Sequence, residues 1–515
     1  APVAQGTVVD LLFAAARDRP HAIALICGED RLDYAGYAAA VRALAHKLHA
    51  ASHAAGRIAT LLPNSLDACI AHFAVLAAGR QLAPLNPGHM PRELDFELRD
   101  ARPDMLLADT TLRAALMPTI LELGMTVLWV GSGEMRFADA ASAVDACAAP
   151  LPELDPASLA LLQYTGGTSG RPKGVDLTHA SLRVNVAQRE AMLPTRADGE
   201  RILCAMPLFH SYGMAMGLYL AVHCRGTLVI LPDYRREALF DAVERHAITV
   251  FPGSPTLYAG LLDHPRFESV DWSSVRTCYS GAAALPVALM ERWRSAVGVS
   301  IYEGYGQTEA GPVLSYNSPF APVKSGSVGR PLPGTLIEIV DVETGSRVLA
   351  TGSAGEIRAR GPQLMQGYRN RPEETAEALR NGWLYTGDIG EFDADGYLFI
   401  RDRKKDMVIV SGYNVYPREI EEVLQAHPAV LEAAVIGEPD SYRGEVLHAF
   451  VVLRSDTHLD NAIDELQAYC AGQLVRYKRP ARLTLVGRLP KTSVNKTDKK
   501  ALRSAPPGTA VAAHP

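Results

Sequence analysis

The spacing of apolar residues predicts alternating helices and strands through the first 300 residues. Apolar positions recur with a helical period over residues 35–51 and 66–80, and the short apolar run at 56–63 between them is typical of a buried strand. The same alternation returns between Ile202 and Gly281. Strands that alternate with helices of about 10 to 15 residues favour βαβ units on parallel sheets. We therefore expect an α/β fold.

The pattern changes from about Gly326 onwards. Short alternating strands are predicted at residues 336–341, 355–360 and 396–402, and turn pairs such as Pro-Gly, Thr-Gly and Asp-Gly separate them. The pair Asp395-Gly396 is a hairpin signal between two apolar runs. This part of the chain therefore indicates a more antiparallel, barrel-like subdomain.

A charged run at residues 402–406 (DRKKD) precedes a self-contained stretch of helices and strands. We interpret the run as a domain linker, because two folded stretches lie on either side of it. The expected organisation is an N-terminal domain over residues 1–402, a linker at 403–406, a small α+β domain at 407–503 and a disordered tail at 504–515.

Composition and charge narrow the class of protein. The 515 residues are 48% hydrophobic and 21% charged, as in ordinary globular proteins, and the net charge of −6 gives no reason to expect a nucleic-acid partner. No stretch reaches the roughly 18 uncharged apolar residues of a membrane-spanning helix. The cysteines are scattered singly, which argues against a disulfide framework or zinc cluster and favours a soluble cytoplasmic protein; they are Cys27, Cys69, Cys147, Cys204, Cys224, Cys278 and Cys470.

The strongest local signal is the segment YTGGTSGRPKG at residues 164–174. Backbone N–H groups of a loop rich in glycine and hydroxyl residues can converge on an anion, and Lys173 adds positive charge suited to a polyphosphate. The segment is not a Walker A loop, because Pro172 precedes the lysine and Gly174 follows it. Taken alone, an ordinary glycine-rich turn remains an equal alternative.

Three further segments carry groups suited to a nucleotide. In YEGYGQTEAGP (residues 302–312), Thr308 and Glu309 offer a hydroxyl and a carboxylate suited to Mg²⁺ on phosphates. In GWLYTGDIG (382–390), Asp388 could accept hydrogen bonds from two ribose hydroxyl groups. The segment LPKTSVNKTDKKALR (489–503) is basic and mobile, with lysines at Lys491, Lys496, Lys499 and Lys500. Each is weak alone.

Together and in this order, the four segments resemble the adenylate-forming (ANL) superfamily, which includes acyl-CoA synthetases, firefly luciferase and the adenylation domains of peptide synthetases. The resemblance spans about Val8 to Leu502. It implies a large N-terminal domain of two doubly wound αβ lobes plus a small β-barrel, with a small mobile α+β C-terminal domain. It also implies a two-step reaction, in which a carboxylate attacks the α-phosphorus of ATP and a thiol then displaces AMP from the acyl-AMP.

The resemblance also implies roles for individual residues. Glu309 is expected to bind Mg²⁺, Thr308 to donate to the α-phosphate, and Lys496 to bridge the substrate carboxylate and the nucleotide. Asp388 and Arg403 resemble the residues that hold the ribose. The phosphate loop comprises Thr165, Gly166, Gly167, Thr168, Ser169, Gly170 and Lys173, and the adenine slot Gly281, Ala282, Ala283, Tyr305 and Gly306.

In the superfamily, the C-terminal domain swings about a hinge between the half-reactions. Lys405 falls at that hinge, and Gly412 belongs to the loop that is expected to open a thiol tunnel. The chain departs from the usual pattern at Gly166, at Ser169 and at Asn495, where many members have serine, threonine and glycine respectively. The glycine at position 166 resembles fatty acyl-CoA synthetases in particular.

The expected acyl pocket has no formal charge. An amino-acid substrate is disfavoured, because no aspartate stands near residues 209–211 to hold an α-amino group. The glycines at 304 and 311 are expected to leave room for an aryl ring or an aliphatic chain. His210 is expected at the border of the pocket and among the catalytic groups; the pocket residues are His210, Gly213, Met214, Phe251, Gly253, Ser254, Gly304, Gly311, Pro312 and Val313.

The sequence therefore predicts an enzyme of the acyl-CoA synthetase branch, an AMP-forming acid:CoA ligase for an apolar fatty or aryl acid. It would use ATP, Mg²⁺ and CoA, as a monomer or a homodimer. The alternative is a stand-alone adenylation enzyme that loads the acid onto a carrier-protein phosphopantetheine. A binding protein without catalysis is disfavoured because the expected catalytic residues are present: Lys173, Glu309, Asp388, Arg403 and Lys496.

Overall fold

The computed structural model describes residues 6–51, 56–142, 150–165, 172–196, 199–411, 413–440, 442–454, 461–492 and 496–504. The chain divides into two compact units. The first comprises Ala1–Leu285, Leu289–Leu336 and Ala359–Leu384, and the second comprises Pro286–Ala288, Ile337–Arg358 and Tyr385–Pro515. The expected domain division between residues 402 and 403 stays a prediction.

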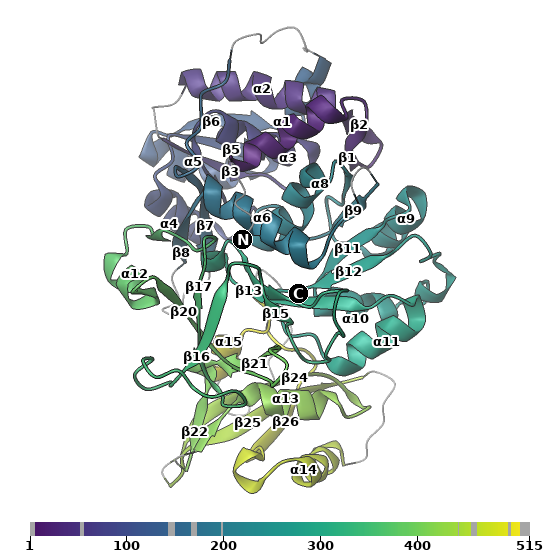
Figure 1. The fold of residues 1–515 in the computed structure, drawn as a ribbon, viewed down its shortest axis with the longest axis vertical. Coiled ribbons are helices and arrows are strands. Elements are labelled where there is room, and N and C mark those ends of the chain that lie inside the picture. Colours follow the sequence, from purple (N-terminus) through teal and green to yellow (C-terminus); the bar gives the residue numbers. More distant parts are fainter. Residues whose placement is uncertain are drawn as a thin grey trace. The chain divides into compact units, whose positions relative to one another are not determined.

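A nine-stranded sheet forms one half of the first unit (Figure 1). The six central strands, β13, β12, β11, β9, β10 and β1, are parallel, as the alternation of helices and strands predicted. Antiparallel strands flank them at both edges of the sheet. In spatial order the nine strands are β15 (Arg330–Pro331), β14 (Val313–Tyr316), β13 (Ile301–Gly306), β12 (Thr277–Ser280), β11 (Val250–Gly253), β9 (Arg201–Cys204), β10 (Thr227–Ile230), β1 (Ile23–Cys27) and β2 (Asp30–Asp33).

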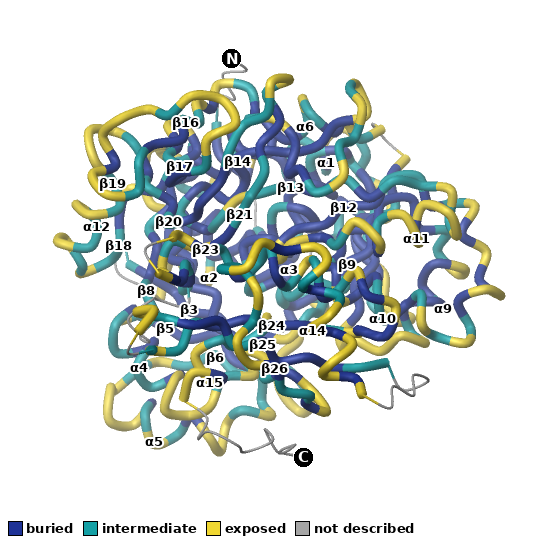
Figure 2. The backbone as a smooth tube through the Cα atoms, turned by 90° about the horizontal axis from the view of Figure 1, so that it is seen from below, coloured by how far each residue is buried: buried dark blue, intermediate teal, exposed yellow. Residues whose placement is uncertain are grey.

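Aromatic rings concentrate in the core on one face of this sheet. The helices that belong to it are α9 (Arg236–His246), α10 (Pro255–Leu262) and α11 (Val287–Val297). Tyr258 and Trp293 meet edge to face with ring centroids 4.7 Å apart, and Phe251 lies 5.9 Å from Trp293. Figure 2 shows this interior as dark blue strands, with the exposed loops in yellow. Burying these large side chains removes much apolar surface from water, which stabilises the packing of the three helices on the nine-stranded sheet.

A seven-stranded sheet forms the other half of the first unit. Strands β3 to β7 are parallel, and β8 and β18 continue the sheet in antiparallel pairing. The order is β18 (Gly367–Tyr368), β8 (Lys173–Thr178), β7 (Leu159–Thr165), β4 (Gln81–Pro84), β3 (Arg57–Leu61), β5 (Met105–Asp109) and β6 (Thr126–Val130). Its helices are α2 (Tyr34–Ala51), α3 (Leu66–Ala77), α4 (Pro91–Ala101) and α5 (Arg113–Leu123).

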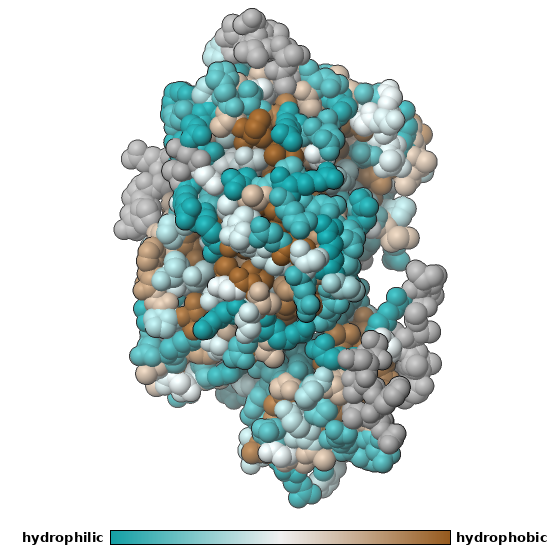
Figure 3. Space-filling model, turned by 90° about the vertical axis from the view of Figure 1, so that its right-hand side faces the viewer, coloured by the Kyte–Doolittle hydropathy of each residue, from teal (hydrophilic) through white to brown (hydrophobic). Residues whose placement is uncertain are grey.

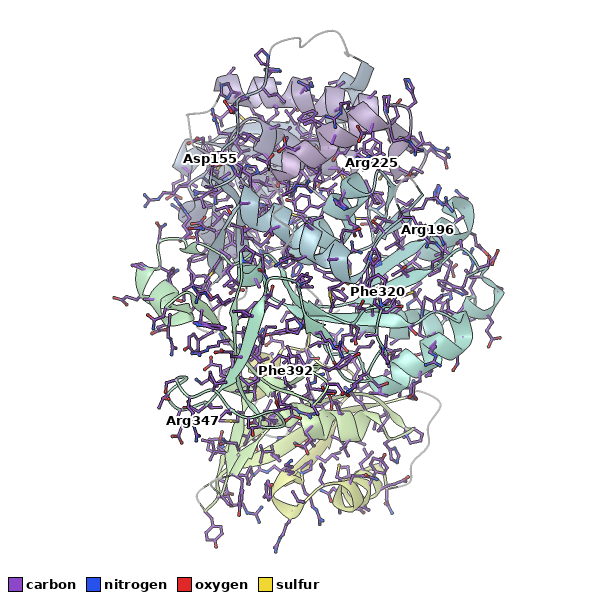
Figure 4. The ribbon with its side chains drawn as sticks, viewed as in Figure 1. Asp155, Arg196, Arg225, Phe320, Arg347 and Phe392 are labelled. Carbon is purple, nitrogen blue, oxygen red and sulfur yellow. The ribbon has the colours of Figure 1, made fainter. Side chains whose placement is uncertain are left out.

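Helix α6 (His179–Met192) connects the two sheets, because it packs against β7, β8 and β14. The side-chain amide of Asn185 donates to the carbonyl oxygen of Val313 at 2.9 Å and accepts from its N–H at 3.2 Å. Helix α1 (Val8–Asp18) begins at a Thr7 capping box and packs against α2 and α6. Arg225, labelled in Figure 4, pairs with Asp18 at the end of α1.

Two further sheets lie mainly in the second unit. One has the order β16 (Leu336–Val340), β17 (Gly355–Arg360), β20 (Trp383–Phe392) and β19 (Leu379–Arg380), with β21 (Leu398–Arg403) on β20. The other has the order β23 (Tyr413–Val415), β22 (Val408–Val410), β25 (Gly444–Leu453) and β24 (Val430–Asp440), with β26 (Arg482–Leu485) on β25. Three helices pack against the strands of this second sheet: α13 (Pro417–Gln425), α14 (Ala462–Gln473) and α15 (Lys499–Ser504).

The hairpin predicted at Asp395-Gly396 is confirmed. β20 and β21 are antiparallel partners on either side of it, and Phe392, labelled in Figure 4, pairs with Leu398. Gly396 has φ = 77°, and Asp393 accepts from the N–H groups of the turn. Glycine adopts this left-handed conformation without the steric penalty of a Cβ atom, which explains the turn.

The surface carries both polar and apolar residues, as the mixed composition of the sequence leads us to expect. The face drawn in Figure 3 mixes hydrophilic and apolar side chains. Among the described residues, no helix combines the length and the apolar character needed to cross a bilayer.

Candidate active site

The glycine-rich loop is carried by the antiparallel hairpin of β7 and β8. Thr165, at the end of β7, pairs with Lys173, at the start of β8, and its Oγ1 lies 3.5 Å from the Lys173 carbonyl oxygen. The hairpin register therefore fixes both ends of the loop. The expected phosphate ligands Gly166, Gly167, Thr168, Ser169 and Gly170 lie outside the described residues, and their role stays a prediction.

Lys173 contacts two side chains from the segment that follows β18. Its Nζ lies 4.9 Å from the ring centroid of Tyr368, and it forms an ion pair with Glu374 of α12 (Pro372–Ala378). Tyr368 is placed there by the pairing of β18 with β8, in which it lies opposite Val175. The ammonium group is thus held beside an aromatic face and a carboxylate at the base of the loop.

Glu309 lies in a 3₁₀ turn, Thr308–Ala310, between β13 and β14. Its Oε1 accepts a hydrogen bond from the Tyr368 phenol at 2.9 Å, and its carbonyl oxygen accepts from the Met365 N–H at 2.9 Å. Tyr368 therefore contacts both Lys173 and Glu309, although these two residues are far apart in sequence. The structure brings together two of the expected nucleotide ligands through a residue that the sequence did not single out.

Thr308 is close to the segment that contains His210. The hydroxyl groups of Thr308 and Ser211 lie 3.3 Å apart, and both residues are buried. His210 precedes the short helix α7 (Ser211–Gly213), and its Nδ1 accepts from the Tyr212 N–H at 3.2 Å. This contact orients the imidazole ring.

Several segments expected around the acyl group lie next to one another. The Tyr212 phenol donates to the Gly253 carbonyl oxygen at 3.3 Å, and a Cβ atom at Gly281 would lie 2.8 Å from the Tyr212 ring. A Cβ atom at Gly213 would lie 2.1 Å from the Pro207 carbonyl oxygen. Met214, 1% exposed, begins a π-helical turn, Met214–Leu218, a rare conformation that is common at functional sites. Ser254 caps α10 by accepting from the Leu257 N–H.

The glycines at 304 and 311 closely approach neighbouring residues on the side where a Cβ atom would stand. A Cβ atom at Gly304 would lie 2.4 Å from a ring carbon of Tyr316, and one at Gly311 would lie 2.5 Å from the Gln363 carbonyl oxygen. Close packing therefore requires glycine at both positions, and their place in the acyl pocket stays a prediction. Phe251 packs with the core aromatic rings, as described above. Pro312 and Val313 are buried in the turn and strand that follow.

The residues expected around adenine lie at two strand ends. Ala282 has φ = 68°, a left-handed conformation that strains a residue with a Cβ atom, and Ala282 and Ala283 are exposed while Gly281 is buried. Tyr305 is half-buried on β13, opposite Ser315. At Gly306, a Cβ atom would lie 2.0 Å from the Pro312 carbonyl oxygen, so glycine is required where β13 and β14 converge.

The remaining site residues belong to the second unit. Asp388, 4% exposed, lies opposite Arg403 in the pairing of β20 with β21, and its Oδ1 lies 2.8 Å from Nε of Arg403. The two residues expected to hold the ribose are therefore direct neighbours. Lys405 lies in a 3₁₀ turn, Lys404–Asp406, and desolvation lowers its pKa.

Lys496 is exposed and lies close to Thr492. Its N–H donates to Oγ1 of Thr492 at 3.2 Å, and its carbonyl oxygen accepts from the Thr492 N–H at 2.7 Å. These two contacts hold the backbone of Lys496 against Thr492. Gly412 and Asn495 lie outside the described residues.

Comparison with known proteins decides the family. Residues 12–369 match the sequence profile of the AMP-binding enzyme family, and residues 419–496 match that of the AMP-binding enzyme C-terminal domain. The chain belongs to the AMP-binding enzyme family. The recognition made from the four motifs is thereby confirmed, together with the predicted α/β fold of a large N-terminal and a small C-terminal domain.

Relatives within the AMP-binding enzymes act on different acids. A long-chain-fatty-acid–CoA ligase of Bacillus subtilis is 37% identical over 477 residues, which cover 87% of this chain and 85% of the relative. A feruloyl-CoA synthase of an Amycolatopsis species is 37% identical over 493 residues, covering 95% and 96%. The solved structure of an anthranilate CoA ligase in complex with anthranoyl-AMP superposes with a TM-score of 0.89 at 28% identity, covering 98% of each chain.

The donor groups of this AMP-binding enzyme fit a nucleotide-bound Mg²⁺. No group of three or more His, Cys, Asp or Glu side chains that could hold a metal by itself is found in the described part of the chain. Mg²⁺ usually keeps several waters and needs only one or two carboxylates beside substrate phosphates. The single carboxylate of Glu309, held near Lys173 by Tyr368, matches that requirement.

Proposed function

We propose that this protein is an AMP-forming acid:CoA ligase. The reaction joins ATP, a carboxylic acid and CoA, and it yields acyl-CoA, AMP and pyrophosphate. The observation that carries the proposal is the meeting of Lys173 and Glu309 at Tyr368, within a unit that matches the AMP-binding enzyme profile. A cation and a carboxylate beside a glycine-rich loop are the groups that a magnesium–triphosphate complex needs.

In the first half-reaction, a carboxylate oxygen of the acid attacks the α-phosphorus, and the bond to the pyrophosphate oxygen breaks. We assign Lys173 and the loop at residues 166–170 to the outer phosphates, where fixed donors stabilise the departing pyrophosphate. Thr308 is assigned to the α-phosphate. Mg²⁺, when bound at Glu309, would supply positive charge that neutralises the phosphate oxygens.

Two residues of the second unit are assigned to the ribose. The buried carboxylate of Asp388 can accept hydrogen bonds from both ribose hydroxyl groups, and the Arg403 guanidinium orients it, with Nε 2.8 Å from Oδ1. Lys496 is assigned to the substrate carboxylate and the nucleotide, because a cation between these two anions lowers their mutual repulsion. Tyr305 and residues 281–283 are assigned to the adenine.

In the second half-reaction, the thiol of CoA attacks the acyl carbon, the thiol proton is lost, and AMP departs. We assign Lys405 to the hinge about which the C-terminal domain rotates, and Gly412 to the loop that admits the thiol. The feruloyl-CoA synthase and the long-chain-fatty-acid–CoA ligase to which the chain is similar both have names that specify CoA as the acceptor, which supports the choice of CoA.

Carboxylate-dependent exchange of labelled pyrophosphate into ATP tests the first half-reaction. The expected result is exchange that requires an acid and Mg²⁺, followed by release of AMP when CoA is added. A product of ADP with inorganic phosphate would contradict the proposal, because it places the attack at the γ-phosphorus. Turnover with a phosphopantetheinyl carrier protein but not with free CoA would replace CoA by the carrier as the acceptor.

A further inference from the structure

Two buried hydroxyl groups from distant segments of the first unit contact each other where Thr308, the residue assigned to the α-phosphate, begins its turn. Oγ of Ser211 lies 3.3 Å from Oγ1 of Thr308, and the two residues are 6% and 7% exposed. Either oxygen could be the donor in this contact. Within the described part of the chain, neither hydroxyl group forms a further hydrogen bond. We name Ser211 and Thr308 the hydroxyl pair.

Backbone contacts on both sides of Ser211 fix its position. On the N-terminal side, Nε2 of Gln163 donates to the Phe209 carbonyl oxygen at 3.0 Å, which ties the segment to β7, the strand that leads into the glycine-rich loop. On the C-terminal side, a Cβ atom at Gly213 would lie 2.1 Å from the Pro207 carbonyl oxygen, so the backbone folds back closely on itself. The Ser211 hydroxyl is therefore held in one place relative to the strand that carries the loop.

The proton of the Thr308 hydroxyl depends on Ser211 for its direction. The Gly311 N–H donates to the Thr308 carbonyl oxygen at 3.1 Å, which holds the backbone of the turn that also carries Glu309. A hydroxyl proton still rotates about its C–O bond to suit its partners. Among the described residues, the partner of Oγ1 is Ser211.

One hydrogen bond between two hydroxyl groups uses only one of their two protons. The proton of the accepting hydroxyl stays available for a ligand. An anion requires a donor, so Thr308 in the loaded site donates to the phosphate and accepts from Ser211. A hydroxyl that accepts one hydrogen bond becomes a stronger donor in the next, because the bonds polarise one another. The separation of 3.3 Å is long for two oxygens, and such contacts commonly tighten when substrate binds.

We propose that Ser211 is a positioning residue for the first half-reaction: its hydroxyl donates to Oγ1 of Thr308 and thereby directs the Thr308 proton at the α-phosphate. This inference rests on the proposed function and on the role assigned there to Thr308. A donor that is already directed where charge develops stabilises the transition state more than it strengthens ATP binding. Loss of the Ser211 hydroxyl should therefore lower kcat and leave KM for ATP nearly unchanged.

The first test is a double-mutant cycle measured by acid-dependent exchange of labelled pyrophosphate into ATP. The acid is whichever of octanoate, palmitate, benzoate or cinnamate gives the fastest exchange with the wild type. We expect kcat to fall about fivefold in Ser211→Ala, as for one neutral hydrogen bond, and about a hundredfold in Thr308→Ala. Adding Ser211→Ala to Thr308→Ala should cost about twofold or less, because the hydroxyl that Ser211 directs is gone.

The outcomes of the cycle separate the inference from the proposed function. Losses that multiply in the double variant, or an unchanged kcat in Ser211→Ala, would overturn the positioning role of Ser211. Full exchange activity in Thr308→Ala would remove Thr308 from the α-phosphate, and the inference with it. Absence of exchange by the wild type with all four acids would instead count against the proposed function.

The second test separates hydrogen bonding from packing. Ser211→Cys fills the space of the hydroxyl with a thiol, a weak donor, so its kcat should stay within about twofold of that of Ser211→Ala. The matched control Ser318→Ala removes a similarly buried hydroxyl that donates to the Met192 carbonyl oxygen at 2.7 Å, and it should retain wild-type exchange. Thermal unfolding checks that each variant is folded. Recovery of the wild-type kcat in Ser211→Cys would show a packing role and overturn the inference.

The third test examines the α-phosphate oxygens directly with the two diastereomers of ATPαS. Sulfur replaces one nonbridging oxygen in each of them and accepts hydrogen bonds only weakly. The wild type should use the diastereomer with sulfur at the contacted oxygen more slowly, and Ser211→Ala should reduce this ratio of kcat values about threefold, since a weaker donor loses less. A structural defect would slow both diastereomers equally, and an unchanged ratio would overturn the inference.

Discussion

The phenol of Tyr368 donates a hydrogen bond to Oε1 of Glu309 at 2.9 Å, and its ring lies 4.9 Å from Nζ of Lys173. One side chain thus positions both an anion and a cation that are assigned to the magnesium–triphosphate complex. Without the hydrogen bond, the Glu309 carboxylate could rotate. Binding of Mg²⁺ would then have to order the side chain, and the entropy cost would weaken the affinity.

Tyr368→Phe is expected to raise the free Mg²⁺ concentration at half-maximal pyrophosphate exchange by about tenfold, which corresponds to one hydrogen bond to a charged group. The ring, and with it the contact to Lys173, remains in the variant. Titration of exchange activity with Mg²⁺ at saturating acid measures the shift. The control is Tyr37→Phe, which removes a buried phenol hydroxyl that donates to the Cys69 carbonyl oxygen. An unchanged Mg²⁺ dependence together with a lower kcat would show that Tyr368 does not position Glu309.

Glu374→Gln is expected to strengthen ATP binding. In this structure Glu374 pairs with Lys173, and ATP phosphates would compete with it for the same ammonium group. A partly exposed ion pair contributes up to about 1 kcal/mol, so the dissociation constant for ATP should fall by about two- to fivefold. Calorimetric titration with ATP measures the change. The matched control is the adjacent Glu373→Gln, and weaker ATP binding by Glu374→Gln would contradict the competition.

Lys496→Ala is expected to separate the two half-reactions. Formation of acyl-AMP should fall by a factor of about 10³ or more, because the charge that offsets the two anions is lost. Thioester formation from synthetic acyl-AMP and CoA should stay within about threefold, because we assign the second half-reaction to a different domain orientation, from which Lys496 is absent. The exposed Lys491→Ala serves as a control. Equal loss of both half-reactions would contradict the assignment of Lys496 to the first step alone.

The free energy of unfolding should decrease as the pH falls below 6.5, because His72 is buried in its neutral form. The ring nitrogen Nε2 of His72 lies 2.6 Å from the Tyr219 phenol oxygen, and burial lowers the pKa of His72 to about 3 from 6.5. The unfolded chain therefore binds a proton between these values that the folded chain does not bind. The contribution of His72 is complete above pH 6.5 and declines below it, by about 1.4 kcal/mol per pH unit.

Urea unfolding at pH 7, 6 and 5 measures this dependence. His72→Gln keeps a polar partner for Tyr219 but does not titrate, so its free energy of unfolding should decline less steeply below pH 6 than that of the wild type. His179 has a pKa lowered by burial to about 4 and accounts for part of the remaining slope. Identical slopes in wild type and His72→Gln would exclude His72 as a contributor.

Local motifs made much of this protein predictable. Glycine and hydroxyl residues before Lys173, the turn with Glu309, and the Asp395-Gly396 hairpin each follow from conformational or chemical requirements that act within a few residues. The alternation of apolar segments indicated the parallel sheets, because its period depends only on local geometry. The order of the motifs identified the superfamily. These features are written in short stretches of sequence and can be recognised there.

Tertiary structure alone decided which distant side chains meet. Tyr368 reaches Glu309 from 59 residues away only because β18 pairs with β8, and no local pattern encodes that pairing. The glycine at 304 could equally have indicated an open pocket or a close approach. The pairing of β13 with β14 decides between them, since it places the Tyr316 ring where a Cβ atom would stand. Sequence determines which groups are available, whereas the register between strands determines which of them share a site.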